Sequence, residues 1–228
     1  MRLKRAVATL ALTCGAGSAA AAPALGVERA GSTPANQTAS ACPTAEIFAT
    51  DNTAIIRDPA DPRLRTRLTR FDHEVRRIIY TQGARPGAST LLNGVFWSAD
   101  LKAATYERSR EFDVDKVSPD GLRHIAGVIA KQYHQESVLT FRCRPRTAPD
   151  IDAVEIQASG VSATRLHDTL LADTEARDEL RGGSVTLNGR LILIAPLADL
   201  PLAQRFTAEL GIVWSTAEVR YGDEEFVS

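Results

Sequence analysis

The stretch "SVTLNGRLILIA", residues 184–195, carries the strongest fold signal in this chain. Two apolar runs flank Asn188 and Gly189, and both of these residues tolerate the positive φ angles of a type I′ turn. The pattern therefore predicts a β-hairpin whose turn lies at Asn188-Gly189. Because a hairpin joins antiparallel strands, this part of the chain favours an antiparallel sheet.

Helices and strands alternate around the hairpin. Capping residues and apolar residues at helical spacing predict helices over 61–80, 118–133, 162–180 and 199–210. Short apolar runs predict strands over 91–97, 136–144, 153–158 and 216–222. A helix followed by strand material recurs along the chain, but no residues align well enough to define a repeat.

The connections between these elements complete the predicted fold. The glycines and proline of 83–89 indicate a loop, and Gly182 and Gly183 are expected to end the third helix. The turn at 147–150 makes 153–158 the expected partner of the strand 136–144, whereas 98–112 fits a helix or a strand. We therefore expect an α+β fold, with several helices packed on a mixed or mainly antiparallel sheet.

The N-terminal residues predict export. A basic start at Met1–Arg5, an apolar stretch and the small residues "APA" at Ala22–Ala24 are typical of a secretory signal peptide. The expected organisation is a signal peptide over 1–24, a disordered leader over 25–41 and a single domain over 42–228. A soluble mature chain and a secreted or extracytoplasmic location follow from this interpretation. Only four of the 27 basic residues are lysine, and this usage indicates a bacterial origin.

Cys14 offers an alternative location. A lipid attached to its thiol would anchor the protein to a membrane, and the polar residues 28–41 would then serve as a tether. Thr13 precedes it, where lipoprotein signals end in a small Gly, Ala or Ser, so simple secretion is the preferred prediction. No later segment approaches the ~20 apolar residues of a membrane-spanning helix.

The charge of the mature chain disfavours nucleic acid as a partner. Loss of Arg2, Lys4 and Arg5 with the signal lowers the 27 basic residues to 24, against 28 acidic ones. Binding to phosphates needs a concentrated basic surface. The arginines of 61–80 are therefore interpreted as a solvated helix face with acidic neighbours.

Common catalytic and metal-binding motifs are absent. The four histidines do not stand at zinc-ligand spacing, and no nucleophile elbow or phosphate-binding loop occurs. The acidic pairs Asp113/Asp115 and Asp150/Asp152, and the acids of 50–62, could hold a divalent cation through oxygen ligands. Turn and loop solvation explains them more simply, so the sequence predicts neither a metal nor a cofactor.

One group of residues is a candidate catalytic site. Tyr106 and Arg108 lie in the ambiguous segment, and His134 and Glu136 stand where a helix gives way to a strand. Histidine titrates near neutrality, so His134 with Glu136 could act as a base and its partner if the side chains converge.

Cysteine usage predicts a disulfide. Removal of the signal leaves Cys42 and Cys143, and an even pair of thiols outside the cytoplasm is normally bridged. We expect a Cys42–Cys143 bond that fastens the first ordered segment to the strand 136–144.

The sequence supports two functional hypotheses. The first is an exported, non-catalytic binding module for a protein or a cell-envelope component. The alternative is a small secreted hydrolase that uses His134 and carboxylates. The oligomeric state and the reaction or ligand stay open.

Overall fold

The computed structural model describes residues 42, 44–52, 54–96, 103–144 and 151–228. The predicted signal peptide 1–24 and leader 25–41, with Cys14, lie outside these residues. The chain divides into two units, Met1–Thr38 and Ala39–Ser228, and all described residues belong to the second. Among them, no helix is long and apolar enough to cross a membrane.

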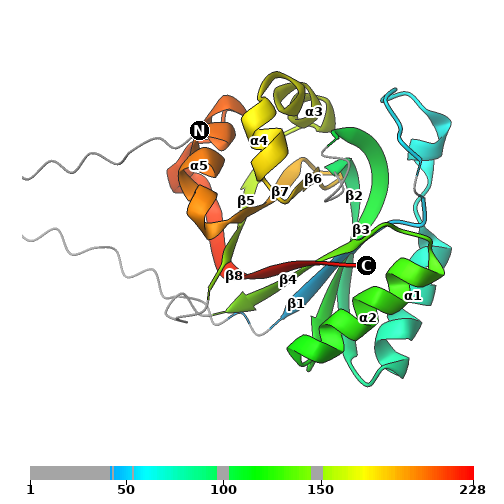
Figure 1. The fold of residues 1–228 in the computed structure, drawn as a ribbon. Coiled ribbons are helices and arrows are strands. Elements are labelled where there is room, and N and C mark those ends of the chain that lie inside the picture. Colours follow the sequence, from blue (N-terminus) through cyan, green and yellow to red (C-terminus); the bar gives the residue numbers. More distant parts are fainter. Residues whose placement is uncertain (1–41, 43, 53, 97–102, 145–150) are drawn as a thin grey trace, which may run out of the picture. The chain divides into compact units, whose positions relative to one another are not determined.

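Eight strands form one sheet in which every neighbouring pair is antiparallel (Figure 1). Their order across the sheet is β2-β3-β1-β4-β8-β5-β7-β6. In chain order they are β1 (Ala45–Ala49), β2 (Arg85–Phe96), β3 (Thr105–Asp115), β4 (Val138–Arg144), β5 (Ala153–Ser159), β6 (Gly182–Val185), β7 (Arg190–Pro196) and β8 (Glu218–Val227). With five α-helices, this confirms the predicted α+β class.

The described chain repeats one topology. The first half has the order β1, α1 (Thr69–Thr81), β2, β3, α2 (Pro119–Gln132), β4. The second half has β5, then α3 (Ala163–Ala172) and α4 (Thr174–Glu179), β6, β7, α5 (Leu200–Glu209), β8. Each half is a β-α-β-β-α-β unit of ferredoxin-like type. The strand order of the second half, β8-β5-β7-β6, mirrors that of the first, β2-β3-β1-β4, so the same topology occurs twice.

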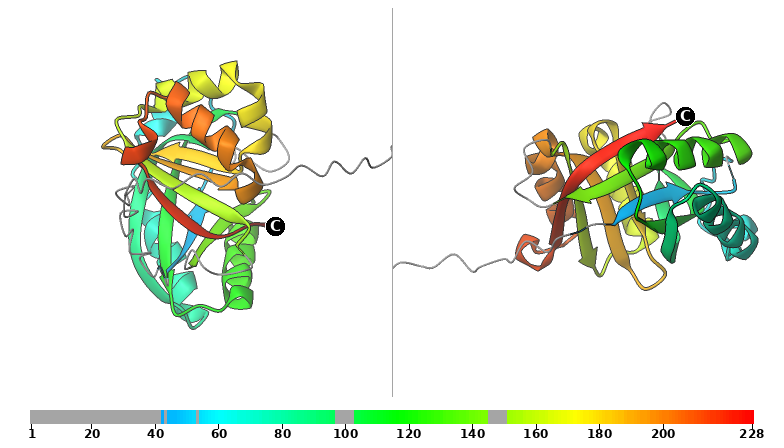
Figure 2. Two further views of the ribbon diagram at one scale, coloured as in Figure 1. Left: turned by 90° about the vertical axis from the view of Figure 1, so that its left-hand side faces the viewer. Right: turned by 90° about the horizontal axis from the view of Figure 1, so that it is seen from below.

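The two halves meet at both sides of the sheet. Their last strands, β4 and β8, pair along their length from Val138↔Val227 to Arg144↔Tyr221. At the opposite side, β2 and β6 are joined by an isolated bridge between Leu92 and Thr186. The sheet therefore curls back on itself, and Figure 2 shows this curvature from two directions.

All the helices cover the outer face of the curled sheet (Figures 1 and 2). α1 and α2 pack with β1 and β3 in one apolar cluster, which includes Phe71, Phe112 and Ile125. α3, α4 and α5 pack with β5 and β7 in a second, which includes Leu166, Leu193 and Phe206. A third, smaller cluster lines the inner face, with members from β1, β2, β4, β5 and β7. Residues of β2 and β7 meet there because the sheet is curled.

Local signals explain where the helices begin. The Ser118 side chain accepts a hydrogen bond from the amide of Gly121, and Ser162 caps α3 in the same way through Arg165. The predicted helix 61–80 starts later than expected. Asp61 caps only a short 3-10 turn, Pro62–Arg65, and α1 begins after Leu68, whose φ of 52° is left-handed. The predicted helix 162–180 is divided at Asp173, whose side chain caps α4.

Several predicted connections are wrong. Residues 83–89 are not a loop, because β2 starts at Arg85. The register between β2 and β3 shifts between Pro86 and Ser89. Gly182 and Gly183 do not end a helix but begin β6. The strand 153–158 does not pair with 136–144, because β8 lies between β4 and β5. The ambiguous segment is a strand from Thr105 onward, whereas 98–102 lies outside the described residues.

The hairpin at 184–195 is confirmed as β6 and β7, but its turn differs from the prediction. Only Gly189 has a positive φ, of 80°, and its amide donates to the carbonyl of Thr186. A type I′ turn needs two residues of positive φ, so this connection is of another type.

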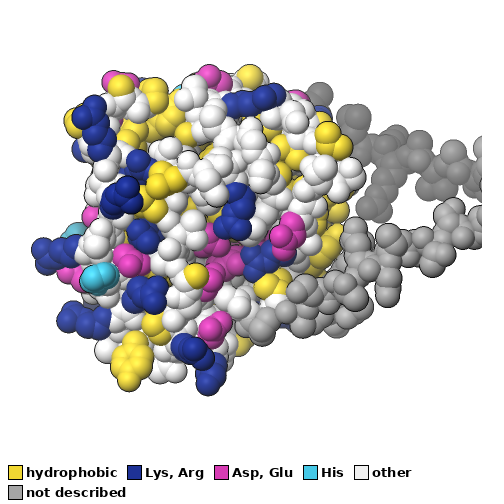
Figure 3. Space-filling model, turned by 180° about the vertical axis from the view of Figure 1, so that it is seen from behind, with side chains coloured by type: hydrophobic (Ala, Val, Ile, Leu, Met, Phe, Trp, Pro, Cys, Tyr) yellow, Lys and Arg dark blue, Asp and Glu magenta, His cyan; other side chains and the backbone are white. Residues whose placement is uncertain are grey.

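Charged side chains are mixed over the surface. Figure 3 shows lysine and arginine side chains spread over one face, with acidic side chains between them. In α1, Arg70 is exposed and pairs with Glu74 at 2.8 Å. Arg63 pairs with Asp61 in the turn before α1, so two arginines of the segment 61–80 have the acidic neighbours that the sequence predicted.

Candidate functional site

The predicted catalytic residues lie on different elements, with Tyr106 and Arg108 on β3 and with His134 and Glu136 after α2. Tyr106 is buried on β3 and stacks on His167 of α3, with ring centroids 4.3 Å apart. Arg108, also on β3, donates from Nε to the carbonyl of Leu64. Each of these two side chains therefore has a partner of its own in the core or at its edge.

His134 and Glu136 are exposed at the end of α2. His134 has a φ of 53°, in the left-handed region that often follows a helix C-terminus. The neighbouring Tyr133 hydroxyl donates to Glu74 at 2.7 Å, which connects α2 to α1. The left-handed backbone of His134 helps to end the helix. The His134 side chain is exposed, whereas that of Tyr106 is buried.

A different group of polar residues lies on the inner face of the sheet. We call it the inner charged cluster, and it consists of Glu46 (β1), Glu111 and Asp113 (β3), Glu155 (β5), Arg190 (β7) and Arg220 (β8). Glu46, Glu111 and Glu155 have exposed fractions of 2%, 5% and 0%. Burial of several ionised groups is costly unless each is paired, so the cluster needs a physical explanation.

Strand alternation and register place these side chains on the inner face. In β1, Ala45, Ile47 and Ala49 pack under the helices, whereas Phe48 belongs to the inner apolar cluster, so Glu46 points inward with it. Directly paired residues of adjacent strands share a face. Glu46 pairs with Asp113, Phe48 with Glu111, and Glu155 with Arg220. These pairings bring charges from four strands together.

Arg220 is the centre of the hydrogen-bond network. Its Nη1 donates to Glu46 Oε1 at 2.5 Å and to Glu155 Oε2 at 2.6 Å. The Gln157 amide donates to Glu155 Oε1 at 2.5 Å, and Arg190 Nη1 donates to Gln157 Oε1 at 3.0 Å. Both carboxylate oxygens of Glu155 therefore accept hydrogen bonds, which offsets the cost of burying this charge completely.

Glu46 and Glu111 are less well satisfied. Glu46 Oε2 and Glu111 Oε2 are buried and have no hydrogen-bond partner. The one ion-pair contact of Glu111 within the described residues is to Arg190 Nη2, at 3.9 Å. Glu111 thus offers, on the inner face, a buried oxygen, Oε2, that has no hydrogen-bond partner in the described part of the chain.

Burial and mutual repulsion shift the titration of these acids. Burial first, and the charge of Glu155 second, raise the pKa of Glu46 well above its ordinary value and that of Glu111 to about 7. Burial also raises the pKa of Asp113, which a backbone hydrogen bond from Ala88 partly offsets. Burial alone would lower the pKa of Arg220, but Glu155 and Glu46 raise it. Arg220 therefore stays charged, and several carboxylates of the cluster depend on this one positive charge.

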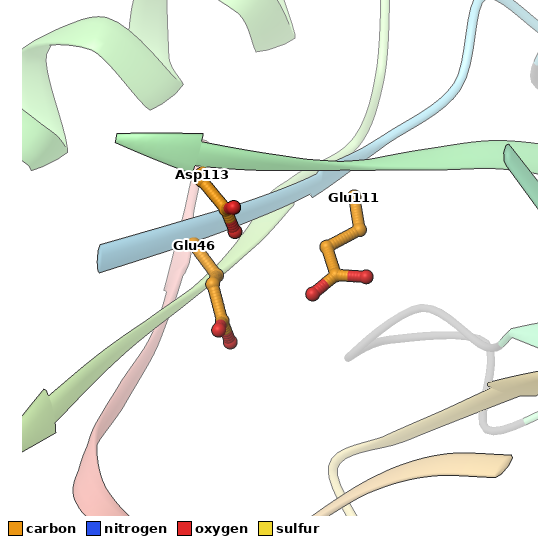
Figure 4. A group of neighbouring side chains, drawn as sticks. All are labelled: Glu46, Glu111 and Asp113. Atoms are coloured by element: carbon orange, nitrogen blue, oxygen red, sulfur yellow. The ribbon is translucent and has the colours of Figure 1, made fainter. Parts of the chain in front are cut away.

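Three of the carboxylates are arranged as metal ligands could be. One oxygen each of Glu46, Glu111 and Asp113 lies within 4.8 Å of the other two. Figure 4 shows the three side chains on the same face of β1 and β3. The sequence offered Asp113 with Asp115 as possible cation ligands, but turn and loop solvation explained this pair more simply. In the structure, Asp113 instead lies with Glu46 and Glu111, neither of which the sequence predicted as a ligand.

Cys42 and Cys143 lie beside this cluster. Both are free thiols in the structure, Cys143 buried and Cys42 partly exposed. A side-chain hydrogen bond links them, and Arg220 Nη2 donates to Cys42 Sγ at 2.8 Å. The hydrogen bond from Cys143 and the charge of Arg220 lower the pKa of Cys42 to about 6, although burial opposes this. The predicted disulfide is not formed here, but its two residues are neighbours.

A sequence signal for the cluster exists in retrospect. Glu46 stands inside "AEIFA" and Glu155 inside "AVEIQA", two otherwise apolar strand segments. An acid within a fully buried strand indicates a paired or functional charge. The strand order that brings these acids together is not encoded in either segment.

Comparison with family models, curated proteins and solved structures gave no match for this chain.

Proposed function

We propose that this chain is an exported binding module that holds a positively charged ligand at the inner charged cluster without converting it. Export makes a protein or a cell-envelope component the natural source of that ligand. The observation that carries the proposal is Glu111, which is 5% exposed and whose buried Oε2 has no hydrogen-bond partner among the described residues. A charge buried in this way lowers stability, and a ligand of opposite charge would offset that cost.

The alternative, a hydrolase that uses His134, has less support. His134 and Glu136 are exposed at the end of a helix, and Tyr106 and Arg108 have other partners. A general base must lie within hydrogen-bond reach of its substrate in a site that excludes water. We therefore prefer the binding hypothesis.

Substitution of Glu111 by Gln tests whether the cluster is a ligand site or a structural network. In ligand-free protein, Glu111→Gln removes repulsion from Glu155 and Asp113, so we expect the free energy of unfolding to rise by about 1 kcal/mol. Glu155→Gln should lower it by about 3 kcal/mol, because Arg220 would lose a buried partner. Urea unfolding of both variants and the wild type gives these values.

Glu225→Gln is the matched control. Its side chain is 47% exposed and pairs with Arg123 on the outer surface, so a change below about 1 kcal/mol is expected. A Glu111→Gln variant that is less stable than the wild type would mean that Glu111 stabilises the fold, and would overturn the proposal.

A further inference from the structure

The spacing of three carboxylates suits a single ion. Calcium binds oxygen ligands at about 2.3–2.6 Å, so two oxygens on one ion cannot lie more than about 5 Å apart. The nearest oxygens of Glu46, Glu111 and Asp113 meet this limit, because all lie within 4.8 Å of one another. They come from two adjacent strands, β1 and β3, whose register Glu46↔Asp113 holds them in place.

Unsatisfied buried oxygens point to a missing partner at the same place. Glu46 Oε1 binds Arg220, whereas Glu46 Oε2 has no hydrogen-bond partner although the residue is only 2% exposed. Glu111 Oε2 is also buried without a hydrogen-bond partner, since its contact with Arg190 is 3.9 Å long, and the hydroxyl of Ser109, two residues earlier on β3, has none either. Buried polar atoms in native proteins nearly always have a partner, and an ion is one kind that these oxygens accept.

The charge balance is consistent with a divalent ion. The inner charged cluster has four carboxylates, and Arg190 and Arg220 supply two positive charges. When all six groups are ionised, an excess of two negative charges is left on the inner face. One divalent cation neutralises this excess, whereas a monovalent cation or a further arginine would leave part of it.

We propose that Glu46, Glu111 and Asp113 together bind one hard divalent cation, of the calcium, magnesium or manganese class. This inference rests on the proposed binding function and names the ligand of the same cluster. Carboxylate oxygens select hard ions, whereas zinc and copper favour imidazole and thiolate ligands. Asp113 is the partly exposed member of the three, so it gives the ion a route from solvent and leaves positions for water ligands.

Titration of the purified, chelator-treated protein with calcium, magnesium and manganese chloride tests the proposal. Calorimetry and native mass spectrometry should show one ion per chain, with a Kd for at least one of the three below ~1 mM, as in extracellular calcium modules. Asp113→Asn and Glu111→Gln should each weaken that binding by at least about tenfold. Glu225→Gln, which alters an exposed acid on the outer surface, should bind as the wild type does.

The outcomes separate this inference from the proposed function. If none of the three ions binds, or if both ligand variants bind like the wild type, the cation assignment is wrong. If no ion binds but Glu111→Gln is more stable than the wild type, the cluster is still a site for another positively charged ligand. If no ion binds and Glu111→Gln is less stable, both proposals fail. Circular dichroism of each variant establishes that it is folded before its binding is compared.

Discussion

At the scale of single residues, the fold changes the pKa of the Cys42 thiol, and alkylation can measure this change. The hydrogen bond from Cys143 and the charge of Arg220 lower its pKa to about 6, whereas the pKa of Cys143 is raised. Only the thiolate reacts with alkylating agents. In reduced, folded protein, we expect the alkylation rate of Cys42 to rise with pH through about 6 and then to level off, while Cys143 stays unreactive.

Arg220→Gln provides the comparison for this pH profile. It removes the charge that stabilises the thiolate, so the midpoint of Cys42 alkylation should move to higher pH. The measurement is iodoacetamide labelling at a series of pH values, read by peptide mass. A midpoint near the ordinary cysteine value in the wild-type protein would contradict the prediction.

At the scale of elements, β8 connects the two halves of the sheet, and Gly222 lies where it passes between β4 and β5. Gly222 pairs with Cys143 on one side and Ala153 on the other, and a Cβ there would overlap the carbonyl of Arg142 and the ring of Phe141. We therefore expect Gly222→Ala to lower the free energy of unfolding by about 3 kcal/mol or more. Denaturant unfolding measures this loss.

Gly127→Ala is the matched glycine substitution in a helix. A Cβ at Gly127 of α2 would have its nearest neighbour at 3.8 Å, which is ordinary contact. Alanine also favours a helix over glycine, so this variant should gain up to about 1 kcal/mol. If both substitutions change the free energy of unfolding by similar amounts, the close approach of Gly222 to its neighbours on β4 does not limit stability.

At the scale of the whole molecule, the predicted Cys42–Cys143 disulfide would join the first described residue to β4. The two residues stand 101 positions apart, and for such a loop the chain-entropy model gives about 4.7 kcal/mol of stabilisation, often less in practice. Cys42 packs against the inner apolar cluster that contains Cys143, so the two residues that the bridge would join are neighbours. We expect protein isolated without reductant to carry no alkylation label at either cysteine after denaturation.

Peptide mass after denaturing alkylation decides this point. The same protein treated with reductant should carry a label at both Cys42 and Cys143, which controls for access of the reagent. Labels at both cysteines of the unreduced protein would show that the thiols are free.

The sequence by itself determined the fold class, the starts of α2 and α3, and the hairpin at 184–195. Local features sufficed for this: Ser118 and Ser162 cap helices through their nearest amides, and the apolar runs around Asn188-Gly189 form the hairpin. These signals depend on residues a few positions apart, where propensity and hydrogen bonding act directly. They indicated an α+β class with a mixed or mainly antiparallel sheet, and the structure has an α+β fold whose sheet is antiparallel.

Only the tertiary structure decided the order of the strands and the composition of the candidate site. β8 inserts between β4 and β5, and the bridge from Leu92 to Thr186 curls the sheet so that Glu46, Glu111, Asp113 and Glu155 face one another. Strand pairing joins residues far apart in the chain, and its free energy depends on the packing of the whole sheet. No local pattern around Glu46 or Asp113 specifies the other, because their proximity exists only after β1 and β3 have paired.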